Sequence, residues 1–329
     1  SLIWIVVLSP DLSRKMTTQD SYRYGDLYRL SNLSKFKDPR KSCDTYQVPA
    51  KAQSGKKVHL YILGDSFTEK ERLDKKDFVV DEYTYVHWSK MLHLKLDTTQ
   101  TNIFLMEVVE RNFREKYFRT PIQNLIPDSK TYIDTAHHEP FMHKLDAAFA
   151  SDQTRDRLDE ILFQNDLMLG LKQLKADFNL KYFNRTVKEV TPVNQGRNIV
   201  YYQDTDTDTT KTTSSFAPVT DAEIDSMVTH LNQSMELAKG MGFDHVLFSI
   251  IPNKVSVLMP EYGVYNNLIN RVQHHAKLHV PFVDIYADFT KMGEGAYLKG
   301  DSHWTCAAQY LWLNKINQHI NRLVQGPVI

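Results

Sequence analysis

The stretch His59–Thr68, HLYILGDSFT, places a run of β-forming residues and a glycine directly before a serine. The run predicts a buried strand over residues 57–63. Gly64 allows the chain to turn sharply, which would present Ser66 at the end of that strand. A serine hydroxyl is a poor nucleophile unless a base lies beside it. Ser66 is therefore a candidate nucleophile if the chain supplies a base, and otherwise a serine that caps a turn.

Strands and helices alternate in the rest of the sequence. Further strands are predicted from the short apolar runs at 102–109, 245–251 and 280–286. Helical spacing or capping signals predict helices over 84–94, 140–185, 221–239, 263–278 and 305–323. This alternation predicts an α/β fold with a mostly parallel sheet and helices on both faces.

The predicted sheet core does not use the whole chain. Residues 11–55 are polar with little periodicity, and residues 1–55 are predicted to form an N-terminal arm. Residues 56–329 are predicted to form the α/β domain. The stretch at about 113–244 is too long for a single crossover, so we expect a long helical insertion there, with a loop in the Thr- and Asp-rich tract 204–215.

The composition excludes some classes of function. Lys and Arg together number 40, as do Asp and Glu, so the net charge is zero. A general nucleic-acid binder would need surplus cations, so no nucleic-acid partner is expected. Two cysteines provide neither a disulfide framework nor a metal-ligand set. Free thiols are favoured for Cys43 and Cys306, and a bridge between them stays open.

The apolar run Leu2–Leu8 is too short to span a bilayer, which takes about 20 residues. We interpret it as part of an N-terminal signal or anchor segment. The alternative is an ordinary buried strand. On the first interpretation, the protein works outside the cytoplasm, in the periplasm or at the cell surface, and is tethered to a membrane.

The carboxyl ends of parallel strands gather functional groups at one edge of a sheet. The stretch Tyr297–Thr305, YLKGDSHWT, follows the last predicted strand and precedes a helix. Asp301 could hold one imidazole nitrogen of His303, and the other nitrogen could take the proton of Ser66. The alternatives are a structural histidine at a helix start and an aspartate that caps the helix.

Donors for an oxyanion can be sought at the same edge. The amide of Ser66 could point at the oxyanion, because Gly64 permits a tight turn. Arg111 or Asn112, which follow the second predicted strand, could add a second donor. Asn253 follows the third strand and is a weaker candidate. An exposed or ion-paired arginine and an ordinary loop asparagine are the alternatives.

Leu63–Phe67 (LGDSF) together with Asp301–Thr305 (DSHWT) resembles the SGNH (GDSL-type) hydrolase superfamily. The chain looks closest to its branch of alginate O-acetylation and DHHW-type proteins, with support from 107–111 (EVVER) and 251–254 (IPNK). The resemblance implies a flavodoxin-like three-layer fold. It also implies a triad in which Ser66 is the nucleophile, His303 the base and Asp301 its orienter.

The leading hypothesis is a serine-dependent esterase or O-acetyltransferase. It would act on acetyl esters of an extracytoplasmic polysaccharide or glycan through an acetyl-enzyme on Ser66, and an acyl-donor partner protein is possible. No cofactor or metal is expected, since His137, His138 and His143 match no zinc spacing. The alternative is a non-catalytic cell-surface protein that binds a glycan or a partner on an SGNH scaffold.

Overall fold

The computed structural model describes residues 2–9, 12–13, 23–39, 41–127, 154–163, 165–206, 208 and 210–325. The chain divides into two compact units. The first comprises residues 1–41, 130–199 and 299–302, and the second comprises 42–129, 200–298 and 303–329. These boundaries differ from those predicted for the N-terminal arm and the insertion, because residues 200–244 belong to the second unit, which contains the sheet.

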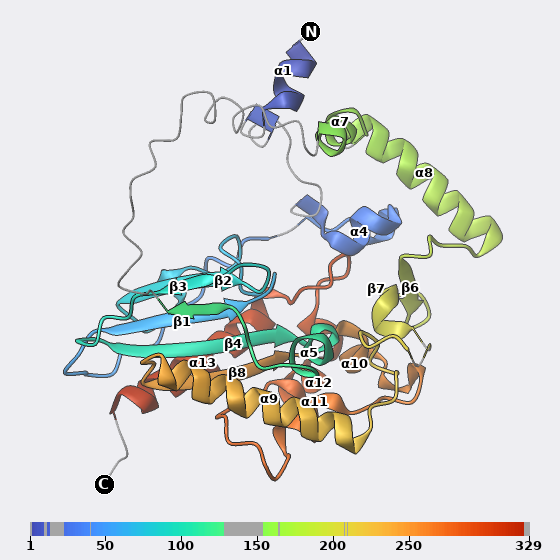
Figure 1. The fold of residues 1–329 in the computed structure, drawn as a ribbon. Helices are drawn as coiled ribbons and strands as arrows, with labels where there is room; N and C mark the ends of the chain where they lie inside the picture. The colour runs from blue at the N-terminus through green and yellow to red at the C-terminus, as the bar shows by residue number, and fades with distance from the viewer. Residues whose placement is uncertain are drawn as a thin grey trace. The chain divides into compact units, whose positions relative to one another are not determined.

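The second unit is built on a parallel sheet with the strand order β2-β1-β4-β8 (Figure 1). Every neighbouring pair in this sheet is parallel. The strands are β1 (Val58–Gly64), β2 (Glu82–His87), β4 (Thr101–Val109) and β8 (His245–Ile251). The prediction of an α/β fold with a mostly parallel sheet is confirmed. The finer prediction of an SGNH-type fold remains a prediction.

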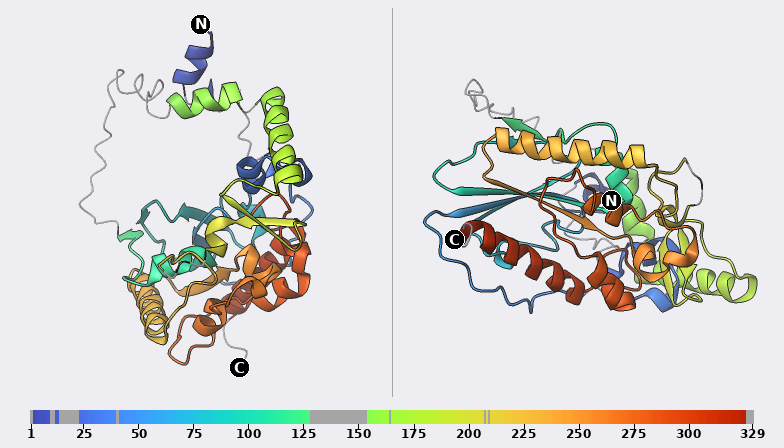
Figure 2. Two further views of the ribbon diagram at one scale, coloured as in Figure 1. Left: turned by 90° about the vertical axis from the view of Figure 1, so that its right-hand side faces the viewer. Right: turned by 90° about the horizontal axis from the view of Figure 1, so that it is seen from below.

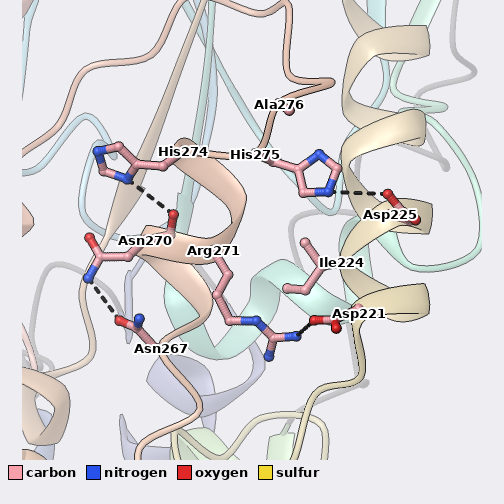
Figure 3. Close-up of a pocket in the computed structure, with 9 residues that line it drawn as sticks. All are labelled: Asp221, Ile224, Asp225, Asn267, Asn270, Arg271, His274, His275 and Ala276. Carbon is pink, nitrogen blue, oxygen red and sulfur yellow. Dashed lines mark hydrogen bonds and ion pairs between the residues drawn. The ribbon is translucent and has the colours of Figure 1, made fainter.

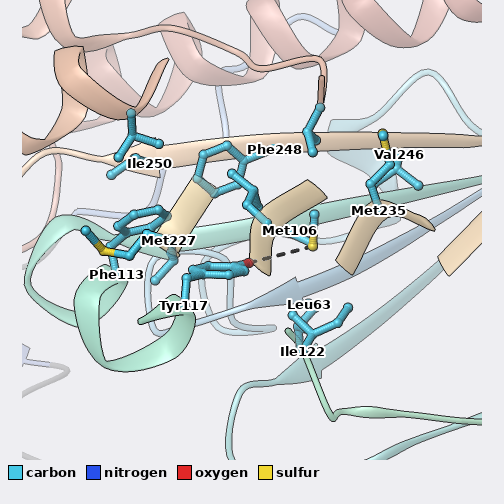
Figure 4. Close-up of a cluster of buried hydrophobic side chains, with 14 of the residues drawn as sticks. Leu63, Met106, Phe113, Tyr117, Ile122, Met227, Met235, Val246, Phe248 and Ile250 are labelled. Atoms are coloured by element: carbon cyan, nitrogen blue, oxygen red, sulfur yellow. Dashed lines mark hydrogen bonds between the residues drawn. The ribbon is translucent and has the colours of Figure 1, made fainter. Parts of the chain in front are cut away.

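Helices cover both faces of this sheet (Figure 2). On one face, α5 (Glu110–Tyr117), α9 (Asp221–Gly240) and α11 (Leu268–Gln273) contribute to one apolar cluster with alternate residues of β4 and β8 (Figure 4). On the other face, α12 (Tyr286–Met292) and α13 (Cys306–Gln325) contribute to a second cluster. Alternation along each strand sends side chains to both clusters, as a sheet buried on both faces requires.

Several predicted elements are confirmed. β1, β4 and β8 match the expected runs to within a residue. The capping box also forms, because the Thr220 hydroxyl accepts from the Glu223 N–H at 3.2 Å and the Glu223 carboxylate accepts from the Thr220 N–H at 2.7 Å. The helix expected over 263–278 is shorter, and its N-cap Asn267 is left-handed at φ 55°.

Two predictions of secondary structure are wrong. Residues 84–94 form β2 and the short β3 (Leu92–Leu94) instead of a helix. The aromatic and β-branched residues of this segment suit an edge strand as well as a helix, and pairing with β1 selects the strand. The strand expected over 280–286 is reduced to a bridge between Phe282 and Phe248, and the chain then turns into α12.

The remaining described elements are short or lie in the first unit. The second unit also holds β5 (Leu125–Pro127), α10 (Lys254–Leu258) and the 3₁₀ turns at Lys75–Asp77, Tyr202–Thr205, Pro260–Tyr262 and Gly293–Ala296. The first unit holds α1 (Leu2–Leu8), α4 (Asp26–Ser31), the 3₁₀ turn Ser34–Phe36, α7 (Thr154–Phe163), α8 (Asp166–Phe183) and β6 (Val190–Val193). β6 pairs with β7 (Asn198–Tyr201), within which the boundary between the units falls.

The apolar run at the N-terminus is helical, so the alternative of a buried strand is wrong. Val6 and Val7 of α1 are buried, whereas Ile3, Trp4 and Ile5 are about half exposed. Among the described helices, none is long and apolar enough to cross a membrane.

Cys43 and Cys306 form a disulfide, so the preference for free thiols is wrong. The bridge links residues 263 positions apart and ties the segment before β1 to the first residue of α13. The separation of Cys43 and Cys306 in the sequence could not predict the bridge, because only the fold brings the two cysteines together.

We predict that the paired substitution Cys43→Ser and Cys306→Ser lowers the free energy of unfolding by about 2–5 kcal/mol, because the bridge restricts the unfolded chain over a long loop. Urea unfolding followed by tryptophan fluorescence measures this loss. A reductant should destabilise the wild type to a similar extent and leave the variant unchanged. Equal unfolding midpoints for the variant and the oxidised wild type would contradict the prediction.

Candidate active site

The turn after β1 brings Ser66 to a histidine from the far end of the chain. Ser66 Oγ lies 2.8 Å from His303 Nε2. Ser66 is partly buried, and His303 is 6% exposed. This is the distance at which an imidazole nitrogen can accept the hydroxyl proton. The structure thus brings together the predicted nucleophile and the predicted base, which are 237 residues apart.

Two buried carboxyl groups hold the turn in place. The Asp65 carboxylate accepts from the Phe67 N–H at 3.0 Å and from the Val109 N–H at the end of β4 at 2.9 Å. Glu107 Oε2 accepts from the Asp65 N–H at 3.0 Å and from the Thr68 hydroxyl at 2.9 Å. Three of these four hydrogen bonds attach the turn to β4, the fourth lies within the turn, and none involves Ser66.

The backbone N–H of Ser66 differs from those of its neighbours in its hydrogen bonding. The Phe67 and Thr68 N–H groups donate to Asp65 within the turn, and the Asp65 N–H donates to Glu107 of β4. Among the described residues, no acceptor lies within hydrogen-bond distance of the Ser66 N–H. This N–H is thus available as a donor beside its own hydroxyl, which is what an oxyanion requires.

His303 is held by the chain on each side of it. The Leu298 N–H donates to the His303 carbonyl at 3.0 Å, and Tyr297 forms an antiparallel bridge with Trp304. The Phe67 ring lies 4.6 Å from the imidazole, centroid to centroid. Because both the backbone and the ring of His303 are packed, the side chain is set toward the Ser66 turn.

Asp301 lies in the segment 299–302, which belongs to the first unit. Asp301 is 2% exposed. The residues on each side of it are hydrogen-bonded to α4 and its start: the Tyr28 N–H donates to the Gly300 carbonyl at 2.8 Å, and the Ser302 N–H donates to the Asp26 carboxylate at 2.7 Å. The segment is thus fixed by the N-terminal arm, and the role predicted for Asp301 stays a prediction.

The other predicted site residues have structural partners. The Asn253 amide donates to Ser215 Oγ at 2.9 Å, and its oxygen accepts from the Arg111 N–H at 3.1 Å. The Arg111 guanidinium lies 3.7 Å from the carboxylate of Asp204. Asn112 is partly buried on α5. None of these contacts aims a donor at Ser66, so the Ser66 amide is the best supported oxyanion donor.

Sequence reasoning missed the role of Glu107, a carboxyl group in the middle of the apolar β4. Glu107 is fully buried, and burial together with the nearby Asp65 carboxylate raises the pKa of Glu107 well above its usual range. The raised pKa favours the neutral form of the Glu107 carboxyl group beside the Asp65 carboxylate. An acidic residue inside a buried strand is itself a signal, since such a group is almost never buried without a partner.

A second buried carboxyl group, Glu110, follows β4. Glu110 accepts from the Asn253 N–H at 2.8 Å, the Ser256 hydroxyl at 2.6 Å and the Tyr265 hydroxyl at 3.0 Å. Burial raises the pKa of Glu110 to about 7. The tract 204–215, predicted as a loop, contributes the buried Ser215 to the same network. This network organises the carboxyl ends of β4 and β8.

The other histidine groups give no metal site in the described residues. His137, His138 and His143 lie outside them. His275, whose Nε2 lies 3.2 Å from the Asp225 carboxylate, borders an open pocket between α9 and α11 (Figure 3). Asp221 and Arg271 also line this pocket and pair with each other at 2.7 Å. Its charges therefore satisfy one another, and neither Ser66 nor His303 lines it.

Comparisons with protein families, with curated proteins and with solved structures find no significant match to the chain. The class of site therefore rests on geometry alone. It is a serine–histidine pair at the carboxyl end of a parallel α/β sheet, and within the described part of the chain the serine amide donates no hydrogen bond.

We predict that Glu110 makes the protein less stable as the pH rises. The folded pKa of about 7 exceeds the ordinary value of 4.5, so the folded state binds more protons between these values. Stability from this group therefore falls by up to about 3 kcal/mol between about pH 4.5 and 7. Urea unfolding across this range should show the decline in the wild type and a smaller one in Glu110→Gln. Parallel curves would contradict the assignment.

We also predict that Gly64→Ala disturbs the Ser66 turn. A Cβ at this position would lie 2.0 Å from Thr68 Oγ1 and 2.8 Å from Glu107 Oε2. Overpacking of this kind costs about 1–3 kcal/mol of stability, which thermal unfolding can measure. Gly55→Ala is the matched control, because its Cβ would meet nothing within 4 Å. Equal stability of the two variants would argue against a tightly fixed turn.

Proposed function

We propose that the protein is a serine-dependent esterase or O-acetyltransferase that acts on acetyl esters of an extracytoplasmic glycan. The observation that carries the proposal is the 2.8 Å contact between Ser66 Oγ and His303 Nε2. The free N–H of Ser66 adds a donor where charge would develop. The chemistry is nucleophilic catalysis by a serine that a histidine activates.

In the first half-reaction, Ser66 Oγ attacks the carbonyl carbon of the ester while its proton passes to His303 Nε2. The carbonyl oxygen becomes an oxyanion, which the Ser66 N–H stabilises. The bond between the carbonyl carbon and the leaving oxygen then breaks, and His303 gives its proton to that oxygen. The product is an acetyl-enzyme on Ser66 and a free alcohol.

In the second half-reaction, a water molecule or a sugar hydroxyl attacks the acetyl-enzyme. His303 takes the proton of the acceptor and returns it to Ser66 Oγ as acetate or an acetylated sugar leaves. Asp301 is the candidate for orienting the imidazole and for stabilising its charged form. Esterase and transferase differ only in the acceptor. No step needs a cofactor or a metal ion.

The Cys43–Cys306 disulfide supports a location outside the cytoplasm, because such bridges persist in oxidising compartments. A polysaccharide substrate and an acyl-donor partner protein rest on the resemblance to SGNH proteins of the alginate O-acetylation branch. The competing proposal is a protein that binds a glycan without catalytic activity. Such a protein would not need the contact between Ser66 and His303.

We predict that the protein releases acetate from a small aryl acetate, and that Ser66→Ala and His303→Ala each lower the rate by roughly 10³-fold or more. Ser89→Ala is the matched control, since Ser89 is an exposed serine that is hydrogen-bonded to His87. It should retain the wild-type rate.

An added oligosaccharide acceptor distinguishes the two activities. Acetylated sugar formed at the expense of acetate indicates a transferase, and acetate alone indicates an esterase. A wild type that is no faster than the two variants, and that does not react at Ser66 with a fluorophosphonate probe, would contradict the proposal and favour the glycan-binding function.

A further inference from the structure

The outer face of α8 carries a continuous apolar stripe. Its side chains recur at intervals of three or four residues and are 52–75% exposed, and they are Leu167, Leu171, Leu174, Phe178 and Tyr182. This spacing places them on one side of the helix. The largest exposed apolar patch on a soluble protein is often functional, so the stripe is a candidate interaction surface.

The opposite side of α8 is mixed, with the buried Leu169 and the partly buried Ala176 and Leu180 beside polar residues. Asp177 accepts from the Ser34 N–H at 3.1 Å, and Gln173 donates to the Tyr28 hydroxyl. Leu169 is the buried apolar residue on this side. Among the described residues, packing within the first unit therefore uses the side of α8 that carries Leu169, Gln173 and Asp177 and leaves the stripe exposed. Contacts between the described residues of this unit do not account for the stripe.

Cations border the stripe on both sides. At 100° per residue, Lys175 lies just beyond one edge of the stripe and Lys181 just beyond the other, and both are exposed. The acidic residues Asp166 and Asp177 instead point away from it and pair with Arg23 and Ser34. Lysines at such borders can reach anionic headgroups while the apolar side chains enter the lipid.

The stripe is too small to hold two copies of the chain together. α8 has 18 residues, so the face is roughly 27 Å long and 10 Å wide, or about 300 Å² for each copy. A stable interface takes about 800 Å² from each partner. Binding to a lipid surface requires no minimum contact area, because its strength scales with the apolar area that enters the membrane.

We propose that the apolar face of α8 binds a membrane surface that contains anionic lipids, with α8 lying in the plane of the headgroups. This inference is independent of the proposed function. The helix α1, whose Ile3, Trp4 and Ile5 are also exposed, belongs to the same unit.

The test is cosedimentation of the full chain with phosphatidylcholine vesicles, with and without phosphatidylglycerol. We expect binding to the anionic vesicles, and a loss of at least about tenfold in the partition coefficient for the paired change Leu171→Gln and Phe178→Gln. The paired change Lys175→Glu and Lys181→Glu should weaken binding to anionic vesicles by about tenfold or more and make it insensitive to salt.

The matched control is the paired change Leu237→Gln and Val264→Gln, which removes exposed apolar side chains of the second unit. It should bind as the wild type does. Circular dichroism and thermal unfolding establish that each variant folds.

Three results would overturn the proposal. The first is a wild type that binds neither kind of vesicle, and the second is binding that the α8 changes leave intact and only changes in α1 remove. The third is a wild-type dimer in sedimentation velocity that the Leu171→Gln and Phe178→Gln change dissociates, since the stripe would then be covered by a second copy.

Discussion

The site depends on the hydrogen bonds that attach the turn after β1 to the end of β4. Asp65 and Glu107 together occupy three backbone N–H groups and one hydroxyl around Ser66. The amide and hydroxyl of Ser66 are the groups they leave for other partners. Burial and the Asp65 carboxylate raise the pKa of Glu107 well above its usual range, which favours its neutral form, so two acidic residues can share one buried site. The position of Ser66, the candidate nucleophile, is thus set by hydrogen bonds of other residues.

His303 reaches this turn through the C-terminal part of the chain. The Leu298–His303 hydrogen bond and the Tyr297–Trp304 bridge close the segment that carries the histidine. Three residues later, Cys306 anchors α13 to the segment before β1 through the disulfide. Residues distant in sequence are therefore held together at the carboxyl edge of the sheet, where an α/β fold collects its functional groups.

Local patterns in the sequence predict β1, β4, β8 and α9, because apolar runs and capping boxes determine these elements without distant partners. The pattern over 84–94 fits a helix or a strand, and only pairing with β1 decides between them. Ser66 and His303 could be singled out from their neighbours in sequence. Three other features could not be predicted from the sequence, since each depends on contacts across the fold. They are the role of Glu107, the hydrogen bonds of Asn253 and the Cys43–Cys306 bridge.

The central claim is that Ser66 carries an acyl group during turnover. The most direct measurement is rapid quenching of the enzyme with a small acetyl ester, followed by intact mass and peptide mapping. The account predicts a gain of one acetyl group on Ser66 in the wild type and none in Ser66→Ala. Turnover of the ester with no acetyl group on Ser66, or with the acetyl group on another residue, would contradict it.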